Sequence, residues 1–197
     1  GPYVLAGHSF GGLYALTFAA QYPDDVAGLV LVDSTAPASA ATPATSPDES
    51  SYDIMGRVSA LLSSTAELGV GRLLSQGSYD SLPPQSADEA EATGSTASNL
   101  QSTIDEYLQA NTSTGQAAAL DDFGDKPLVV LTAGSGSDAD WIAAHDDLAA
   151  LSTNSAHRVV DGATHDSLIS DEQDAAATTQ AILDAVSSVP SRERLVR

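Results

Sequence analysis

Four short segments made almost entirely of apolar residues limit the possible folds of this chain to a small set. Strands buried on both faces of a sheet have such continuous apolar runs, whereas strands with one face in water alternate apolar and polar residues. Continuous strands of this kind occur in parallel sheets that helices cover on both sides, so the segments favour an α/β fold. The four predicted strands are residues 3–6 (YVLA), 26–32 (VAGLVLV), 127–133 (PLVVLTA) and 157–160 (HRVV).

Helical patterns separate these strands. In each pattern the apolar residues recur at near-helical spacing, which predicts one buried face. Pro23 ends the first helix, because proline cannot continue one. The predicted helices are residues 12–22, 139–151 and 171–189.

Residues 36–125 differ in composition from the rest of the chain. They open with a loop-like stretch rich in proline, alanine, serine and threonine over residues 36–51, and two helical patterns follow. We therefore predict a core formed by residues 1–35 and 126–197, with a helical insertion between two strands of one sheet. The apolar positions of the two patterns are Ile54, Val58, Leu61 and Leu62, then Leu100, Ile104, Tyr107 and Leu108.

Composition limits the partners that the chain can bind. Its 197 residues, 42% of them hydrophobic, suffice for one domain with a sizeable core. The net charge of −20 argues against nucleic acid and anionic membranes, because both bind clustered positive charge. Absent cysteine excludes disulfides and thiolate metal sites, and no apolar run reaches the roughly 18 residues of a membrane span. Residues before Gly1 could carry a signal or anchor, which leaves the compartment and membrane association open. The sequence also leaves the oligomeric state open.

The segment GHSFG, residues 7–11, joins the first predicted strand to the first predicted helix and fits Gly-x-Ser-x-Gly. A turn this tight holds Ser9 in a strained backbone conformation and lifts its hydroxyl above the sheet edge. Side chains two positions to either side would collide, which explains Gly7 and Gly11. The backbone N–H of Phe10 lies at the helix N-terminus, where a developing oxyanion is stabilised. The alternative is a glycine-rich helix start with a capping serine.

A reactive serine needs a base and an acid that orients the base. His165 is the best candidate base, because it lies in the loop DGATHDS directly after the fourth predicted strand. The alternative for His165 is an incidental loop histidine. We expect the other three histidines to be packing or surface residues, with the His8 side chain pointing away from the serine; they are His8, His145 and His157.

Two aspartates compete for the role of the acid. Asp138 follows the third predicted strand, but Ser137 and Asp140 beside it also suggest a helix cap. Asp33 follows the second predicted strand, where a turn-capping role is equally credible. The chain order serine, aspartate, histidine holds for either residue.

These segments resemble the α/β-hydrolase superfamily. Residues 1–35 resemble the fifth strand, nucleophile elbow, following helix and sixth strand of that fold. KPLVVLTAG resembles the seventh strand, and HRVVDGATH resembles the eighth strand with its histidine loop. The resemblance implies an α/β-hydrolase fold with the last four strands of its parallel sheet, flanking helices, and a helical cap at residues 36–125.

The same resemblance implies roles for individual residues. Ser9 would be the nucleophile, His165 the base and the Phe10 N–H one oxyanion donor. The commonest acid position of the family favours Asp138, whereas some members place the acid where Asp33 lies.

The family also predicts parts that lie before the first residue of this chain. Its first four strands and its usual second oxyanion donor precede the elbow. We therefore expect the C-terminal part of a longer protein, or a partial gene model, with residues 3–6 forming a bare strand edge. We further expect these residues alone to fold poorly and turn over weakly.

The favoured function is a serine hydrolase that cleaves a carboxylic ester or a related small acyl substrate through an acyl-enzyme. A serine rather than an aspartate at position 9 argues against dehalogenase and epoxide-hydrolase chemistry. Alternatives are a cofactor-free haloperoxidase or perhydrolase, a C–C hydrolase, and a non-catalytic binding protein of the same fold. No metal or phosphate motif is present, so we expect no cofactor. Ile54, Val58, Leu61 and Leu62 would suit an apolar acyl site, and they fit the core of a plain helix equally well.

Overall fold

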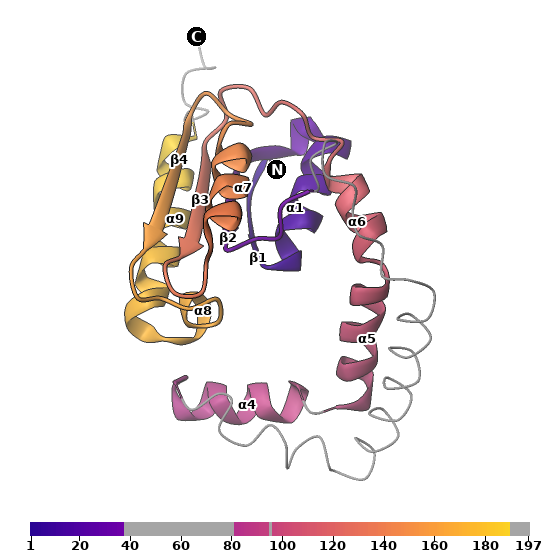
Figure 1. Cartoon of the computed structure of the whole chain (residues 1–197), viewed down its shortest axis with the longest axis vertical. Coiled ribbons are helices and arrows are strands. Elements are labelled where there is room, and N and C mark those ends of the chain that lie inside the picture. The colour runs from indigo at the N-terminus through magenta and orange to yellow at the C-terminus, as the bar shows by residue number, and fades with distance from the viewer. Residues whose placement is uncertain (38–80, 95, 190–197) are drawn as a thin grey trace. The chain divides into compact units, whose positions relative to one another are not determined.

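A computed structural model describes residues 1–37, 81–94 and 96–189. Its centre is a four-stranded parallel sheet with the strand order β1-β2-β3-β4 (Figure 1). All four strands coincide with predicted apolar segments, so the predicted α/β fold with a parallel sheet is confirmed. The strands are β1 (Tyr3–His8), β2 (Val26–Val32), β3 (Leu128–Ala133) and β4 (Ser155–Val160).

The helices around the sheet follow the predicted pattern with small shifts. The first helix begins at Phe10, two residues earlier than predicted, so only Ser9 separates it from β1. Pro23 ends that helix as predicted and opens a short 3-10 helix, η1. These elements are α1 (Phe10–Gln21), η1 (Pro23–Asp25), α7 (Ala139–Ala149), α8 (Ser167–Ser170) and α9 (Glu172–Ser188).

Two apolar layers, one on each face of the sheet, make up the core. Neighbouring residues of a strand point to opposite faces, and in β2 Leu29 and Leu31 pack with α1 and α7. Val30 and Val32 of the same strand pack on the other face, with residues of α8 and α9. Both faces are therefore dry, which is why the strand sequences are continuously apolar. Figure 1 shows α7 and α9 on opposite sides of the sheet.

The chain divides into two compact units, one of residues 1–41 and 113–197 and the other of residues 42–112. The described part of the insertion contains the helices α4 (Pro84–Gly94), α5 (Ala97–Leu108) and α6 (Ala110–Ala117). The second predicted helical pattern falls within α5. The first pattern, Ile54 to Leu62, and most of the predicted loop 36–51 lie outside the described residues. Among the described helices, none combines the length and hydrophobicity that a bilayer span requires.

Candidate active site

Ser9 is the single residue between β1 and α1, and its backbone has the strained conformation that the sequence predicts. Its φ of 56° lies in the left-handed region that non-glycine residues rarely adopt. The Ser9 N–H donates to the carbonyl of Val32 (3.1 Å), at the end of the neighbouring strand. The Ser9 carbonyl accepts from the N–H groups of Gly12 (3.1 Å) and Thr35 (3.2 Å). Backbone hydrogen bonds to β2 and its turn thus hold the serine at the sheet edge.

The three glycines around Ser9 differ in whether the structure requires a glycine at their position. A Cβ on Gly7 would lie 2.4 Å from the carbonyl oxygen of Gly11, which confirms that the turn requires glycine there. The same expectation for Gly11 is wrong, because a Cβ there meets no atom within 4 Å. Gly12 is the second sterically required glycine, since its Cβ would lie 2.4 Å from the side chain of Ser34. The close approach is therefore between α1 and the turn after β2.

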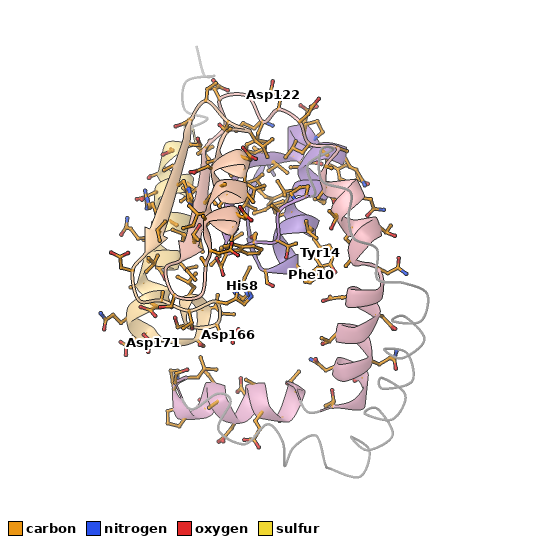
Figure 2. The ribbon with its side chains drawn as sticks, viewed as in Figure 1. His8, Phe10, Tyr14, Asp122, Asp166 and Asp171 are labelled. Atoms are coloured by element: carbon orange, nitrogen blue, oxygen red, sulfur yellow. The ribbon has the colours of Figure 1, made fainter. Side chains whose placement is uncertain are left out.

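Parallel strands bring the predicted site residues to one edge of the sheet. Ser9 follows β1, Asp33 follows β2 and His165 lies in the loop after β4. The carboxyl ends of parallel strands share an edge, where α/β proteins place reactive groups. In Figure 2, His8 and Asp166 lie at this same end of the sheet.

The His165 ring is hydrogen-bonded to Asp33, with 2.7 Å between Nδ1 and Oδ2. Only 4% of Asp33 is exposed, and its other oxygen accepts from the Trp141 indole N–H (2.9 Å) and the Ala133 N–H (3.1 Å). Burial raises the pKa of the Asp33 carboxyl, but the hydrogen bonds from Trp141, His165 and Ala133 outweigh it and hold the pKa below its usual value. Asp33 is thus an ionised acceptor aimed at the histidine.

Asp138, the acid that the sequence favoured, lies elsewhere. Its exposed side chain caps α7 and accepts from the backbone N–H of Trp141 at 2.9 Å. This is the alternative interpretation that its sequence surroundings suggested. The structure therefore pairs His165 with Asp33 and not with Asp138. Which carboxylate acts in catalysis stays a prediction.

His8 holds the histidine loop, a role that the sequence did not suggest. Its Nε2 lies 2.9 Å from the backbone carbonyl of His165, so the ring donates from that nitrogen. The two rings lie 4.3 Å apart between centroids. Burial lowers the pKa of His8, which favours the neutral ring. Because His8 precedes Ser9, this contact brings the His165 loop beside the elbow.

The other two histidines belong to a polar network inside the fold. His145 is fully buried; its Nε2 lies 2.9 Å from the Ser34 carbonyl and its Nδ1 lies 2.5 Å from the hydroxyl of Thr132. The same hydroxyl lies 2.7 Å from Nε2 of His157, whose Nδ1 lies 2.7 Å from Asp146. The one sequence signal of this network is Thr132, a polar residue within an apolar strand.

Phe10 is the first residue of α1, so its N–H belongs to the helix turn that faces the sheet edge. Figure 2 shows the Phe10 and Tyr14 side chains on this helix. The role of the Phe10 N–H as an oxyanion donor stays a prediction. Within the described ranges, no group of three or more histidine or acidic side chains is arranged to hold a metal ion.

Comparisons with known proteins agree with this architecture. A model of the alpha/beta hydrolase family matches residues 1–179. Lipase LipV of Mycobacterium tuberculosis is 61% identical over 33 residues, which are 17% of this chain and 13% of LipV. Two solved structures share the fold. Cfl2 from Burkholderia cenocepacia has a TM-score of 0.61 at 22% identity, and the epoxide hydrolase CorEH has 0.62 at 19%.

The chain spans only part of these proteins. The match covers 90% of this chain but 63% of Cfl2, and 93% of this chain but 68% of CorEH.

Proposed function

Because the chain belongs to the alpha/beta hydrolase family, we propose that it acts as a serine hydrolase on a carboxylic ester or a related acyl compound. The observation that carries this proposal is the buried Asp33 carboxylate bound to His165, at the sheet edge where Ser9 occupies its strained turn. Similarity to a lipase over 33 residues favours an ester over other acyl compounds.

We assign the chemical steps from the hydrogen-bond directions. The ionised Asp33 accepts a hydrogen bond, so Nδ1 of His165 carries the proton and Nε2 is left as the base. Nε2 takes the hydroxyl proton of Ser9 as Oγ attacks the carbonyl carbon of the substrate. The Phe10 N–H donates to the oxyanion of the tetrahedral intermediate.

The intermediate then collapses to an acyl-enzyme. The bond from the carbonyl carbon to the alcohol oxygen breaks, and His165 returns its proton to the departing alcohol. Water attacks the acyl-enzyme with His165 again as base, which releases the acid and restores Ser9. No redox partner enters the sequence of steps.

Labelling with a fluorophosphonate probe tests the proposal. We expect wild-type protein to be labelled and Ser9→Ala not to be labelled, because the probe bonds to an activated serine. Labelling is expected to slow strongly in His165→Ala and Asp33→Asn, whereas Asp138→Asn keeps the wild-type rate. Circular dichroism melts of each variant show whether it is folded. A folded wild type that resists the probe would overturn the proposal and favour a non-catalytic binding protein.

Hydrolysis of a simple nitrophenyl ester tests the substrate class. We expect ester turnover without peroxide. Halogenation that depends on peroxide, in the absence of ester turnover, would instead identify a perhydrolase that uses the same residues.

A further inference from the structure

Two residues of α7, one helical turn apart, hold the turn that carries the proposed acid. The indole N–H of Trp141 donates to Oδ1 of Asp33 at 2.9 Å. Nε2 of His145 lies 2.9 Å from the carbonyl oxygen of Ser34, the next residue of the turn. Residues four apart lie on the same helix face, and the two rings are 4.9 Å apart between centroids. The helix therefore contacts this turn through one pair of packed side chains.

We infer that Trp141 and His145 are positioning residues that hold the Asp33–Ser34 turn in the orientation in which Asp33 binds His165. The effect of this positioning on catalysis rests on the proposed function. Neither side chain touches a reacting atom in this mechanism.

The turn needs such support because its backbone is strained. Asp33 has a φ of 40°, in the left-handed region that few non-glycine residues adopt and that costs free energy unless the surroundings hold it. Its N–H donates to the carbonyl of Leu131 at 2.7 Å, so β3 holds the turn on the backbone side. Trp141 and His145 hold it from α7.

The two donors on Oδ1 decide which oxygen faces the histidine. Trp141 and the N–H of Ala133 both donate to Oδ1, which leaves Oδ2 for His165. Without the indole N–H, one donor remains, and the carboxylate can turn about its Cβ–Cγ bond. Burial raises the pKa of Asp33 and its hydrogen bonds lower it; the hydrogen bond from Trp141 lowers the pKa more than any of the others does.

The orientation of His145 follows from its own partners. Nε2 faces a carbonyl oxygen, which can only accept, so this nitrogen carries a proton. Burial lowers the pKa of His145 and favours a neutral ring, so Nδ1 accepts from the hydroxyl of Thr132. Thr132 lies on β3 and is fully buried. Thr132 of β3 therefore selects the His145 tautomer that can donate to the Ser34 carbonyl.

The hydrogen-bond chain continues to the protein surface. The Thr132 hydroxyl, which donates its hydrogen bond to His145, also lies 2.7 Å from Nε2 of His157. Nδ1 of His157 faces the carboxylate of Asp146, which accepts. His157 thus connects the buried hydroxyl of Thr132 to the exposed carboxylate of Asp146. A continuous chain of hydrogen-bond contacts therefore joins Asp146 to Ser34.

The experiment compares Trp141→Phe with Asp138→Ala. The first keeps an aromatic ring but removes the indole N–H, and the second removes the cap of the same helix while leaving the indole in place. We expect Trp141→Phe to lower kcat on a nitrophenyl ester about tenfold, the size of one lost hydrogen bond to a charged group, with KM unchanged. Asp138→Ala is expected to melt at a lower temperature with kcat unchanged.

His145 offers a second matched pair. Glutamine in His145→Gln can donate to the Ser34 carbonyl from nearly the same place, whereas His145→Leu cannot. We expect kcat close to wild type in the glutamine variant and a fall of about tenfold in the leucine variant. If His145→Leu does not fold, His145→Gln and Trp141→Phe still test the inference.

Proton NMR supplies a readout that does not depend on turnover. The Nδ1 proton of His165, bound to a carboxylate, is expected far downfield in wild type and shifted or broadened in Trp141→Phe. Wild-type kcat and an unmoved resonance in Trp141→Phe would overturn the inference, as would an equal loss of kcat in Asp138→Ala. If wild type hydrolyses no ester but the resonance moves in Trp141→Phe, the positioning role stands and the proposed function fails.

Discussion

The turn after β2 and the loop after β3 each supply an aspartate, and the two carboxylates have opposite surroundings. Asp33 is 4% exposed, has a strained backbone and binds Trp141, Ala133 and His165. Asp138 is exposed and caps its own helix. Both bind the same residue, since the backbone N–H of Trp141 donates to Asp138 and the indole N–H donates to Asp33.

This difference is the reason why we propose Asp33, and not Asp138, as the acid. A helix cap satisfies a donor that its own helix provides, so it needs no other part of the fold. A buried carboxylate needs donors from several elements, because an unpaired buried charge is costly. Here α7, β3 and the loop after β4 supply those donors to Asp33. The exposed aspartate stabilises local structure, and the buried one connects distant parts of the chain.

The largest expected effect comes from the acids themselves. Asp33→Asn should lower kcat/KM by about 10⁴, because the amide no longer favours the tautomer and orientation of His165 that the reaction needs. Asp138→Asn should stay within about threefold of wild type, since asparagine also caps helices well. Steady-state kinetics on a nitrophenyl ester measures both. Equal losses in the two variants would break the distinction between the two aspartates.

The next effect concerns the packing of α1 against the turn after β2. Gly12→Ala should lower the free energy of unfolding by about 2–3 kcal/mol, because the new methyl group would lie against Ser34. Gly11→Ala is the matched control one residue earlier, where space is open, and should leave stability unchanged or raise it by up to about 1 kcal/mol. Urea denaturation of both variants measures the difference. A Gly12→Ala variant as stable as wild type would show that the turn can move.

Acidification should lower the stability of the fold, because it titrates buried groups near the turn after β2. Burial lowers the pKa of His8 and His145 below their ordinary 6.5, so the unfolded chain takes up more protons than the folded chain as the pH falls below that value. Stability is therefore present above about pH 6.5 and declines below it. The lowered pKa of Asp33 adds a further loss when the pH falls through its ordinary value of 3.8 and below.

Denaturant unfolding between pH 7.5 and 5 measures this decline. His145→Gln removes one titrating ring and should show a shallower decline than wild type, whereas Asp138→Asn should show the wild-type decline. A wild type whose stability is flat or rises on acidification would contradict the expected sign.

The smallest effect is the loss of the α7 cap. Asp138→Ala should lower the free energy of unfolding by about 1 kcal/mol, the usual cost of losing an N-cap side chain. Activity per folded molecule should be unchanged, because Asp33 keeps its donors. Thermal melts and kinetics on the same samples check the two statements. A loss of activity without a loss of stability would restore Asp138 as a candidate acid.

The sheet and the elbow could be predicted because their signals are local. A continuous apolar run such as VAGLVLV identifies a strand buried on both faces, and the glycine at position 7 follows from a backbone contact within the same turn. The loop position of His165 follows from the end of the strand before it. The sequence places the start of α1 two residues too late, because Gly11 and Gly12 have low helix propensity. In the structure the turn at Ser9 starts the helix at Phe10.

The partner of His165 could not be predicted in the same way. Asp33 lies 132 residues from His165 and 108 residues from Trp141 along the chain. Local patterns describe both candidate aspartates as caps or turns, and for Asp138 that description is the correct one. Burial and hydrogen-bond donors from other elements distinguish the two aspartates, and neither property can be inferred from the residues next to Asp33 in the sequence.

The order of strands and helices, the strained serine between β1 and α1, and the histidine loop after β4 can all be inferred from sequence patterns. These depend on apolar periodicity and on backbone sterics within a few residues. The contacts of Asp33 with His165, of Gly12 with Ser34, and of Trp141 and His145 with the turn after β2 depend on the folded arrangement. Those contacts join residues far apart in the chain, and they exist only once the sheet has brought its strand ends to one edge.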